Sequence, residues 1–215
     1  LNGESEHVPA RQTVEPSTVG RRSCEPGGDA MVIAYHSVFT TYGAWLPNDP
    51  RGSYSKQVYQ TELRQLAEPQ YGRQSPQPDR ATLSRFWTAA QPNLKHPPYF
   101  ITEATRPLVA QAFGETIRRL GLRAAACAIM NDHVHLVLLR SKYRIEYAVG
   151  QMKGAATHAL GVDRSPWSQG SGWNGFLNDW VAVQAAIEYV EANPPAAALP
   201  PQRWDFVQPL PDSAW

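Results

Sequence analysis

The chain has 215 residues, of which 42% are hydrophobic, and its formal net charge is +1. This length and apolar content predict one domain of about 150 residues with extensions. The near-neutral charge excludes binding to nucleic acid through an overall positive field, so any electrostatic contact with nucleic acid must be local. No apolar stretch is long enough for a membrane span, and we expect no contact with a membrane.

Residues 1–30 differ in composition from the rest of the chain. They are rich in Glu, Ser, Pro and Gly, which predicts a disordered segment or an upstream leader, with the domain beginning at residue 31. Cys24 lies in this polar segment and Cys127 lies in an apolar run, so we expect the two not to pair. Unpaired cysteines fit a reducing cytoplasm, which is where we expect the protein.

The remaining residues predict strands that alternate with helices. The expected order is a strand at 31–41, a proline-rich irregular insertion at 43–100, a helix at 105–120, strands at 122–130 and 133–140, a helix at 143–160, a short strand near 173–178 and a helix at 180–193. Thr105 and Pro107 predict where the first helix begins, and Gly121 predicts where it ends. A domain at 31–195 is expected, followed by a C-terminal tail at 196–215.

The stretch at 131–139 carries two histidines that are separated by one apolar residue. In a β-strand, residues i and i+2 project from the same face, so His133 and His135 present their imidazoles side by side, about 7 Å apart along the strand. The apolar residues around them predict that protein covers both faces of the strand. Imidazoles in such surroundings require partners. The pair is therefore either a structural pair bonded locally or half of a site for a divalent metal.

The last predicted helix carries a tyrosine and an asparagine away from its apolar stripe. Asp179 predicts its N-cap, and Pro194 and Pro195 predict a stop. Tyr189 and Asn193 are four residues apart and so share one flank of the helix, with Asn193 expected at the helix end and pointing outward. Two imidazoles and an amide oxygen suit Mg²⁺ or Mn²⁺, with the tyrosine beside them as a nucleophile.

These residues resemble a known family. The His133 to His135 stretch resembles the His-hydrophobic-His signature of single-tyrosine HUH endonucleases, and Tyr189 to Pro194 resembles the tyrosine helix of the REP-associated tyrosine transposases. Three further stretches resemble that family's first strand, its central helix and the segment before its tyrosine helix: residues 34–41, 149–154 and 167–179. The resemblance extends from about residue 31 to residue 195.

The resemblance implies an α+β fold, with a ferredoxin-like (RRM-like) antiparallel sheet and helices packed on it. It implies that His133, His135 and Asn193 hold the metal and that Tyr189 attacks single-stranded DNA. A free phenol has a pKa of about 10, so it is a poor nucleophile at neutral pH unless a metal polarises the phosphate. Attack would leave a 5′-phosphotyrosine and a free 3′-hydroxyl, and a second hydroxyl could then join strands. The implied function is a metal-dependent endonuclease and strand transferase, a transposase.

Five basic residues are the leading candidates for contacts with DNA phosphates: Arg118, Arg119, Arg140, Arg144 and Lys153. The resemblance implies that the partner is single-stranded DNA, from repeats that form hairpins. We expect a monomer rather than a homodimer, because the insertion and the extensions can cover the edge strand through which copies would pair.

Other interpretations stay open. His36 on the first strand either approaches the site or is satisfied locally, and Tyr143 and Tyr147 are rival nucleophiles that lack an amide four residues on. Nucleotide hydrolases with three alternating histidines are a different enzyme class, but Val137 occupies the third position here. The main alternative is a domesticated, non-cleaving module that binds single-stranded nucleic acid by stacking and charge. A rolling-circle initiator or relaxase would use the same chemistry.

Overall fold

The computed structural model describes residues 31–210 except residues 54, 56, 59 and 60, so the predicted leader, with Cys24, lies outside it. The elements are β1 (Ala34–Thr40), α1 (Thr61–Arg64), α2 (Arg80–Ala90), the 3-10 helix η1 (Gln91–Asn93), α3 (Arg106–Leu120), β2 (Ala124–Ile129), β3 (His133–Leu139), α4 (Ile145–Ala159), β4 (Trp173–Leu177) and α5 (Trp180–Ala196). Among the described helices, none has both the length and the apolar content required to cross a bilayer.

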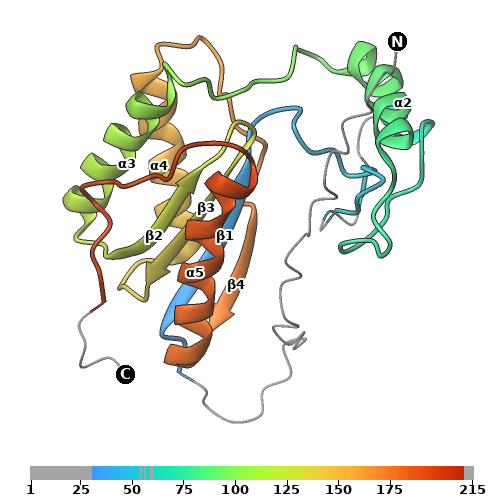
Figure 1. Cartoon of the computed structure of the whole chain (residues 1–215). Helices are drawn as coiled ribbons and strands as arrows, with labels where there is room; N and C mark the ends of the chain where they lie inside the picture. The colour runs from blue at the N-terminus through green and yellow to red at the C-terminus, as the bar shows by residue number, and fades with distance from the viewer. Residues whose placement is uncertain (1–30, 54, 56, 59–60, 211–215) are drawn as a thin grey trace, which may run out of the picture.

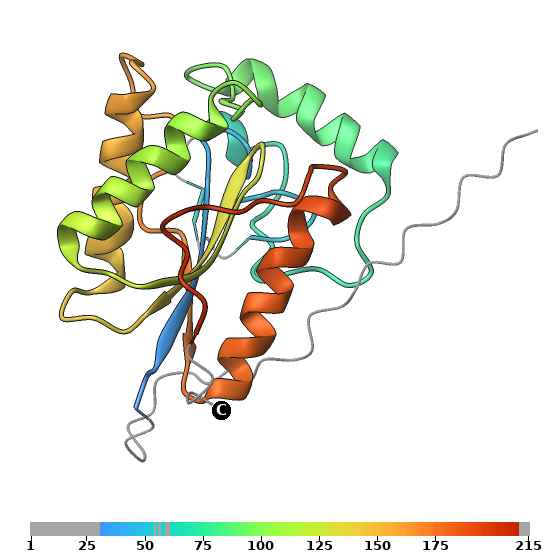
Figure 2. The same cartoon turned by 60° about the vertical axis from the view of Figure 1, so that its left-hand side comes forward.

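The four strands form one antiparallel sheet in the order β2-β3-β1-β4. Because α3 lies between β1 and β2 in the chain and α4 lies between β3 and β4, the path is the βαββαβ of a ferredoxin-like fold. Helices α3 and α4 cover one face of the sheet, and α5 covers the other (Figures 1 and 2). The predicted α+β class and ferredoxin-like sheet are confirmed.

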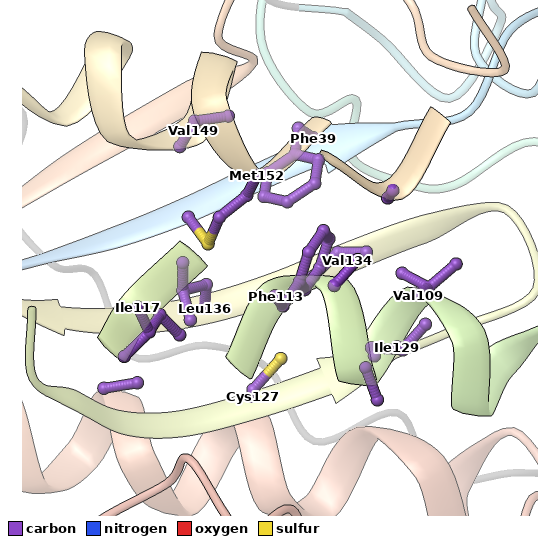
Figure 3. Close-up of a cluster of buried hydrophobic side chains, with 14 of the residues drawn as sticks. Phe39, Val109, Phe113, Ile117, Cys127, Ile129, Val134, Leu136, Val149 and Met152 are labelled. Atoms are coloured by element: carbon purple, nitrogen blue, oxygen red, sulfur yellow. The ribbon is translucent and has the colours of Figure 1, made fainter. Parts of the chain in front are cut away.

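Alternation along β3 sends its side chains into two separate cores. Val134 and Leu136 are fully buried on the face covered by α3 and α4, where Figure 3 shows them with Phe113 of α3. Val137 is fully buried in the second core, beneath α5. His135 projects from the same face as Val137, because the two are two residues apart. The histidine face of β3 is therefore the face covered by α5.

The first helix of the ferredoxin-like unit, α3, begins and ends as the sequence predicts. Thr105 is its N-cap residue, and Gly121 closes it with a φ of 62°, donating its N–H to carbonyls of the last turn. Glycine adopts this left-handed conformation without the steric cost of a Cβ. The chain then enters β2 directly, which places the β2–β3 hairpin beside α3.

The helix that carries Tyr189 extends further than predicted. Pro194 and Pro195 lie inside α5, which ends at Ala196. The fixed φ of proline is compatible with a helix, and at this end of α5 the two prolines remove donors without breaking the last turn. The carbonyls of Asn193 and Pro194 both accept from the Ala197 N–H at 3.1 Å. Since Pro194 is buried, packing stabilises this additional turn.

The sequence predicts an irregular insertion at 43–100, but part of this segment has regular structure. It contains α2, whose N-cap Asp79 accepts from the Thr82 N–H at 2.7 Å. It also has a small core of its own, formed by Leu46, Val58, Leu63, Phe86 and Ala90. The prediction was wrong for α2 because the prolines of this segment flank the helix and do not interrupt it.

The segment after α5 covers the outer edge of β2. The Gln202 side chain accepts from the Ile129 N–H at 2.7 Å and donates to the Ile129 carbonyl at 2.9 Å, in the manner of a strand. Gln208 donates its N–H to the Ala124 carbonyl at 2.9 Å, and Phe206 joins the core under α3. Residues 202–208 of the predicted tail therefore pack against the sheet, and the domain boundary at 195 stays a prediction. This cover also blocks pairing at β2, although the monomer itself stays a prediction.

Candidate active site

The turn between β2 and β3 holds the beginning of the histidine strand in place. This turn consists of Asn131 and Asp132, directly before His133. Buried Arg106 of α3 donates to the Asn131 side-chain oxygen at 2.6 Å. Thr41, directly after β1, donates its N–H and its hydroxyl to the Asp132 carbonyl at 2.8 and 3.0 Å. The turn is therefore fixed from a helix on one side and from the neighbouring strand on the other.

Four side chains form a continuous hydrogen-bonded row on the face covered by α5. Asp132 Oδ1 lies 2.6 Å from His133 Nδ1, and His133 Nε2 lies 3.0 Å from His135 Nε2. The other ring nitrogen of His135, Nδ1, lies 3.2 Å from His36 Nε2. The structure thus brings together the two predicted histidines and places a carboxylate at one end of the row and a third imidazole at the other.

The carboxylate end of the row determines which nitrogens carry protons, because an ionised carboxylate only accepts. His133 donates its Nδ1–H to Asp132, which leaves a lone pair on His133 Nε2. His135 then donates its Nε2–H to that lone pair at 3.0 Å, and His36 donates its Nε2–H to His135 Nδ1. Without the proton between them, the two Nε2 lone pairs would repel at this distance unless a metal cation binds them. Adjacent ligands of an octahedral ion with bonds of about 2.1 Å are about 3.0 Å apart. A carboxylate behind a ligating histidine is also the usual arrangement in metal sites.

The charge states of the row suit metal binding. Burial lowers the pKa of His36 to about 4, and burial with the charges of His133 and His36 holds the pKa of His135 well below its usual value, so both rings are neutral at neutral pH. Burial acts to raise the pKa of Asp132, but the hydrogen bond and charge of His133, with the charge of Arg51, outweigh it and lower that pKa. An ionised Asp132 therefore faces the Nδ1–H of His133.

Tyr189 lies against these imidazoles from α5. Its ring centroid is 5.5 Å from that of His135 and 5.8 Å from that of His36, with the rings edge to face. Tyr143 and Tyr147, the rival nucleophiles, stack on each other at 5.3 Å at the beginning of α4, which covers the opposite face of the sheet. Of these three tyrosines, Tyr189 is the one that contacts the histidines.

Asn193 lies one turn after Tyr189, inside α5 and not at its end as predicted. Its Nδ2 donates to the Tyr189 backbone carbonyl at 2.6 Å. A carbonyl accepts from the amino group of an amide and not from its oxygen, so this bond fixes the orientation of the amide. In the part of the chain that the structure describes, Asn193 Oδ1 accepts no hydrogen bond. The oxygen is available as a ligand atom, and its role as third ligand stays a prediction.

No three His, Cys, Asp or Glu side chains converge on a common metal position within the described residues. His135 directs one nitrogen toward His36 and the other toward His133, so His36 does not share a metal with the pair. A metal would be held by Nε2 of His133 and Nε2 of His135, with oxygen ligands from Asn193, water or the substrate. This mixed nitrogen and oxygen set fits Mg²⁺ or Mn²⁺.

The sequence left the role of His36 open and did not single out Asp132. Asp132 is adjacent to His133, so an acidic residue at a turn directly before a histidine strand was a usable local signal. His36 is paired in register with Val137, which makes it a diagonal neighbour of His135. That neighbourhood depends on the pairing of β1 with β3, which no local pattern in the sequence reveals.

Four of the basic residues predicted to contact DNA lie away from the histidine pair. Arg118 and Arg119 end α3, on the opposite face of the sheet, and both are exposed. Arg140 and Arg144 follow β3, at the far end of that strand from His133, and both are exposed as well. They stay predictions, and they would require DNA that extends well beyond the histidines.

Lys153, the fifth candidate, is committed to contacts within the protein. It is buried in α4, and its Nζ donates to the carbonyls of Ser168 at 2.6 Å and Gly170 at 2.8 Å. Burial lowers its pKa to about 8. The side chain ties the segment before β4 to α4, so a phosphate contact through Lys153 would require these bonds to break.

No protein-family profile matches this sequence, and no curated protein matches it either. Among solved structures, the chain is similar to one described as a REP-associated tyrosine transposase bound to a REP hairpin. The two are 9% identical, the match covers 81% of this chain and 74% of that chain, and the TM-score is 0.44. The fold is assigned from the strand order and connections of this chain, and the comparisons leave its family open.

Proposed function

We propose that the protein is a metal-dependent endonuclease and strand transferase that acts on single-stranded DNA through Tyr189. The observation that carries this proposal is the contact of the Tyr189 ring with His135, whose Nε2 lies 3.0 Å from that of His133. Imidazoles whose Nδ1 atoms are hydrogen-bonded to neighbouring side chains are suited to hold a metal through Nε2. A phenol beside them supplies the nucleophile that phosphoryl transfer requires.

In this proposal His133 and His135 hold a Mg²⁺ or Mn²⁺ ion, with Asn193 Oδ1 as the third protein ligand. When bound, the ion polarises the scissile phosphate and neutralises the charge that develops on its oxygens. Asp132 and His36 act as positioning residues. Asp132 holds the proton of His133 on Nδ1. His36 Nε2, which lies 3.2 Å from His135 Nδ1, would accept the Nδ1–H that His135 carries once a metal takes its Nε2.

In the cleavage step, Tyr189 Oη forms a bond to phosphorus, and the bond between phosphorus and the 3′ oxygen breaks. The phenol loses its proton to solvent and the departing 3′ oxygen takes up a proton, so the products are a 5′-phosphotyrosine and a free 3′-hydroxyl. Attack by a 3′-hydroxyl on the phosphotyrosine reverses these bond changes and joins two strands. One ester replaces another in each step, so no nucleotide cofactor is needed.

The test is to incubate the purified protein with labelled single-stranded DNA from hairpins that flank its own gene, with Mn²⁺ or with EDTA, and to run a denaturing gel. We expect a covalent adduct that requires Mn²⁺, is absent in Tyr189→Phe and His135→Ala, and persists in the matched control Tyr143→Phe. Binding of the same DNA without an adduct at any metal concentration would instead favour the non-cleaving module. An adduct that persists in Tyr189→Phe would exclude Tyr189 as the nucleophile.

A further inference from the structure

Trp173 presents its indole next to the candidate active site. It begins β4 and pairs with Val38, which also pairs with His135, so these side chains share the face covered by α5. The indole centroid lies 5.7 Å from the His36 ring, and the rings are perpendicular. His36 in turn contacts Tyr189. Because Trp173 is 37% exposed, an aromatic surface extends from the nucleophile through His36 to solvent.

The chain leaves space for this indole to lie along the strand. A Cβ at position 175 would come within 2.6 Å of Trp173 Cη2, so the ring lies over Gly175. Gly175 pairs with His36 on β1, directly beside the imidazole that Trp173 contacts. Glycine weakens a strand, and in strands it often marks a place where another group approaches closely. Here the approaching group is the indole, which lies against the strand at Gly175 and is 37% exposed.

The backbone that carries Trp173 is held tightly. Gly172 has a φ of 81°, and a Cβ there would collide with the Val38 carbonyl oxygen, so the chain enters β4 pressed against β1. The segment directly before Gly172 is held by Lys153 of α4, which donates to two of its carbonyls. An aromatic side chain on a fixed backbone loses little freedom when a ligand binds, which favours affinity.

We infer that Trp173 is a stacking platform for one base of the DNA, at a nucleotide next to the phosphate that Tyr189 attacks. This inference rests on the proposed function and specifies its substrate as unpaired DNA, because a base inside a duplex has both faces covered by its neighbours. Stacking on aromatic side chains holds single strands with little sequence preference. Stacking also supplies affinity for DNA that a protein with a net charge of +1 does not gain from contacts with the DNA phosphates.

Phe176 provides a matched control on the same strand. It is 57% exposed, more than Trp173, but it projects from the opposite face and contacts Tyr35. Exposed single aromatics are common and need no function. The difference between the two is that Trp173 contacts the imidazole beside the nucleophile. Loss of Phe176 should therefore leave DNA binding unchanged, although it removes a comparable apolar surface.

The experiment measures binding of the full chain to fluorescein-labelled oligothymidylate in EDTA, so that binding is separated from cleavage. The companion probe is an abasic oligomer of the same length, which has the same phosphates and no bases. Trp173→Ala should weaken binding to oligothymidylate by about 5-fold to 150-fold, the usual contribution of one stacked base. Gly175→Ala should weaken it in the same direction by displacing the indole. Trp173→Phe and Phe176→Ala should bind like the wild type, and all variants should bind the abasic oligomer equally.

Three results would overturn the inference. They are unchanged binding of oligothymidylate by Trp173→Ala, an equal loss for the abasic oligomer, and no binding of oligothymidylate by the wild type. The outcome is separate from that of the cleavage proposal, because no step of this assay uses Mn²⁺ or the hydroxyl of Tyr189. A base-dependent loss in Trp173→Ala, in a protein that forms no adduct, would retain the platform and remove the cleavage.

Discussion

Replacing Asp132 with asparagine tests whether the row of side chains prepares the histidine pair for a metal. Asp132 Oδ1 accepts the Nδ1–H of His133 at 2.6 Å, a charge-assisted bond between partly buried groups. Asp132→Asn retains the size of the side chain and the backbone carbonyl that Thr41 binds. It removes the negative charge that holds the His133 proton on Nδ1, so a fraction of the rings will carry the proton on Nε2, where the metal should bind.

The magnitude follows from the position of Asp132 behind a ligating imidazole. Outer partners of metal-bound histidines typically contribute about 10-fold to 100-fold in metal affinity or activity, which is about 1.4 to 2.8 kcal/mol. The Mn²⁺ concentration for half-maximal adduct formation should therefore rise by this factor in Asp132→Asn. Saturating Mn²⁺ should restore most of the rate, because the variant retains both ligating nitrogens.

The assay is a Mn²⁺ titration of adduct formation, with DNA binding in EDTA as a second measurement that should not change. The matched control is Asp205→Asn, which removes an exposed carboxylate that pairs with Arg118 on the far side of the sheet. An unchanged Mn²⁺ dependence in Asp132→Asn would refute the reasoning about tautomers. A rate that stays low at saturating Mn²⁺ would show that Asp132 acts on another step.

Substitutions at three further positions test other parts of the account. His36→Ala should weaken Mn²⁺ activation by about tenfold or more, because a His135 that binds the metal through Nε2 would lose the partner beside its Nδ1 that accepts the Nδ1–H. His36→Gln should restore most of the activation in the same titration, and equal effects of the two variants would contradict this role. Phe113→Ala removes a fully buried ring beneath α3 and should lower the free energy of unfolding in urea by about 3 to 5 kcal/mol, whereas a loss below about 1 kcal/mol would contradict the packing. Burial lowers the pKa of Lys153 from 10.5 to about 8, so between these pH values the unfolded chain binds one proton more than the folded chain. The melting temperature of the wild type should therefore rise relative to that of Lys153→Met as the pH rises through this window. A difference in melting temperature between the two proteins that does not change with pH would contradict this prediction.

The parts of the site that follow from local chain geometry could be predicted from the sequence. Period-two alternation placed His133 and His135 on one face of a strand, and the structure has them 3.0 Å apart at Nε2. The i, i+4 spacing of Tyr189 and Asn193 likewise placed both on one flank of a helix, where the Asn193 amide binds the Tyr189 carbonyl. These relations hold within a single element, so they do not depend on how the elements pack.

The parts that depend on contacts between distant segments could not be predicted. His36 contacts His135 only because of the register of β1 against β3. The ammonium group of Lys153 is buried only because the segment before β4 folds over α4. Pro194 was expected to stop the helix on local grounds, but its burial stabilises a further turn. In each case tertiary packing changed an outcome that local propensity had left open or had predicted differently.

The most direct test of the central claim is to identify the side chain that becomes attached to DNA. A single strand with sulfur in place of the bridging 3′ oxygen at the cut site would trap the adduct, because the departing thiol reverses the attack poorly. Peptide mass spectrometry would then locate the nucleotide. The account predicts a modified peptide that contains Tyr189, formed with Mn²⁺ and not with EDTA. Modification at Tyr143 or Tyr147, or at any residue other than Tyr189, would contradict it.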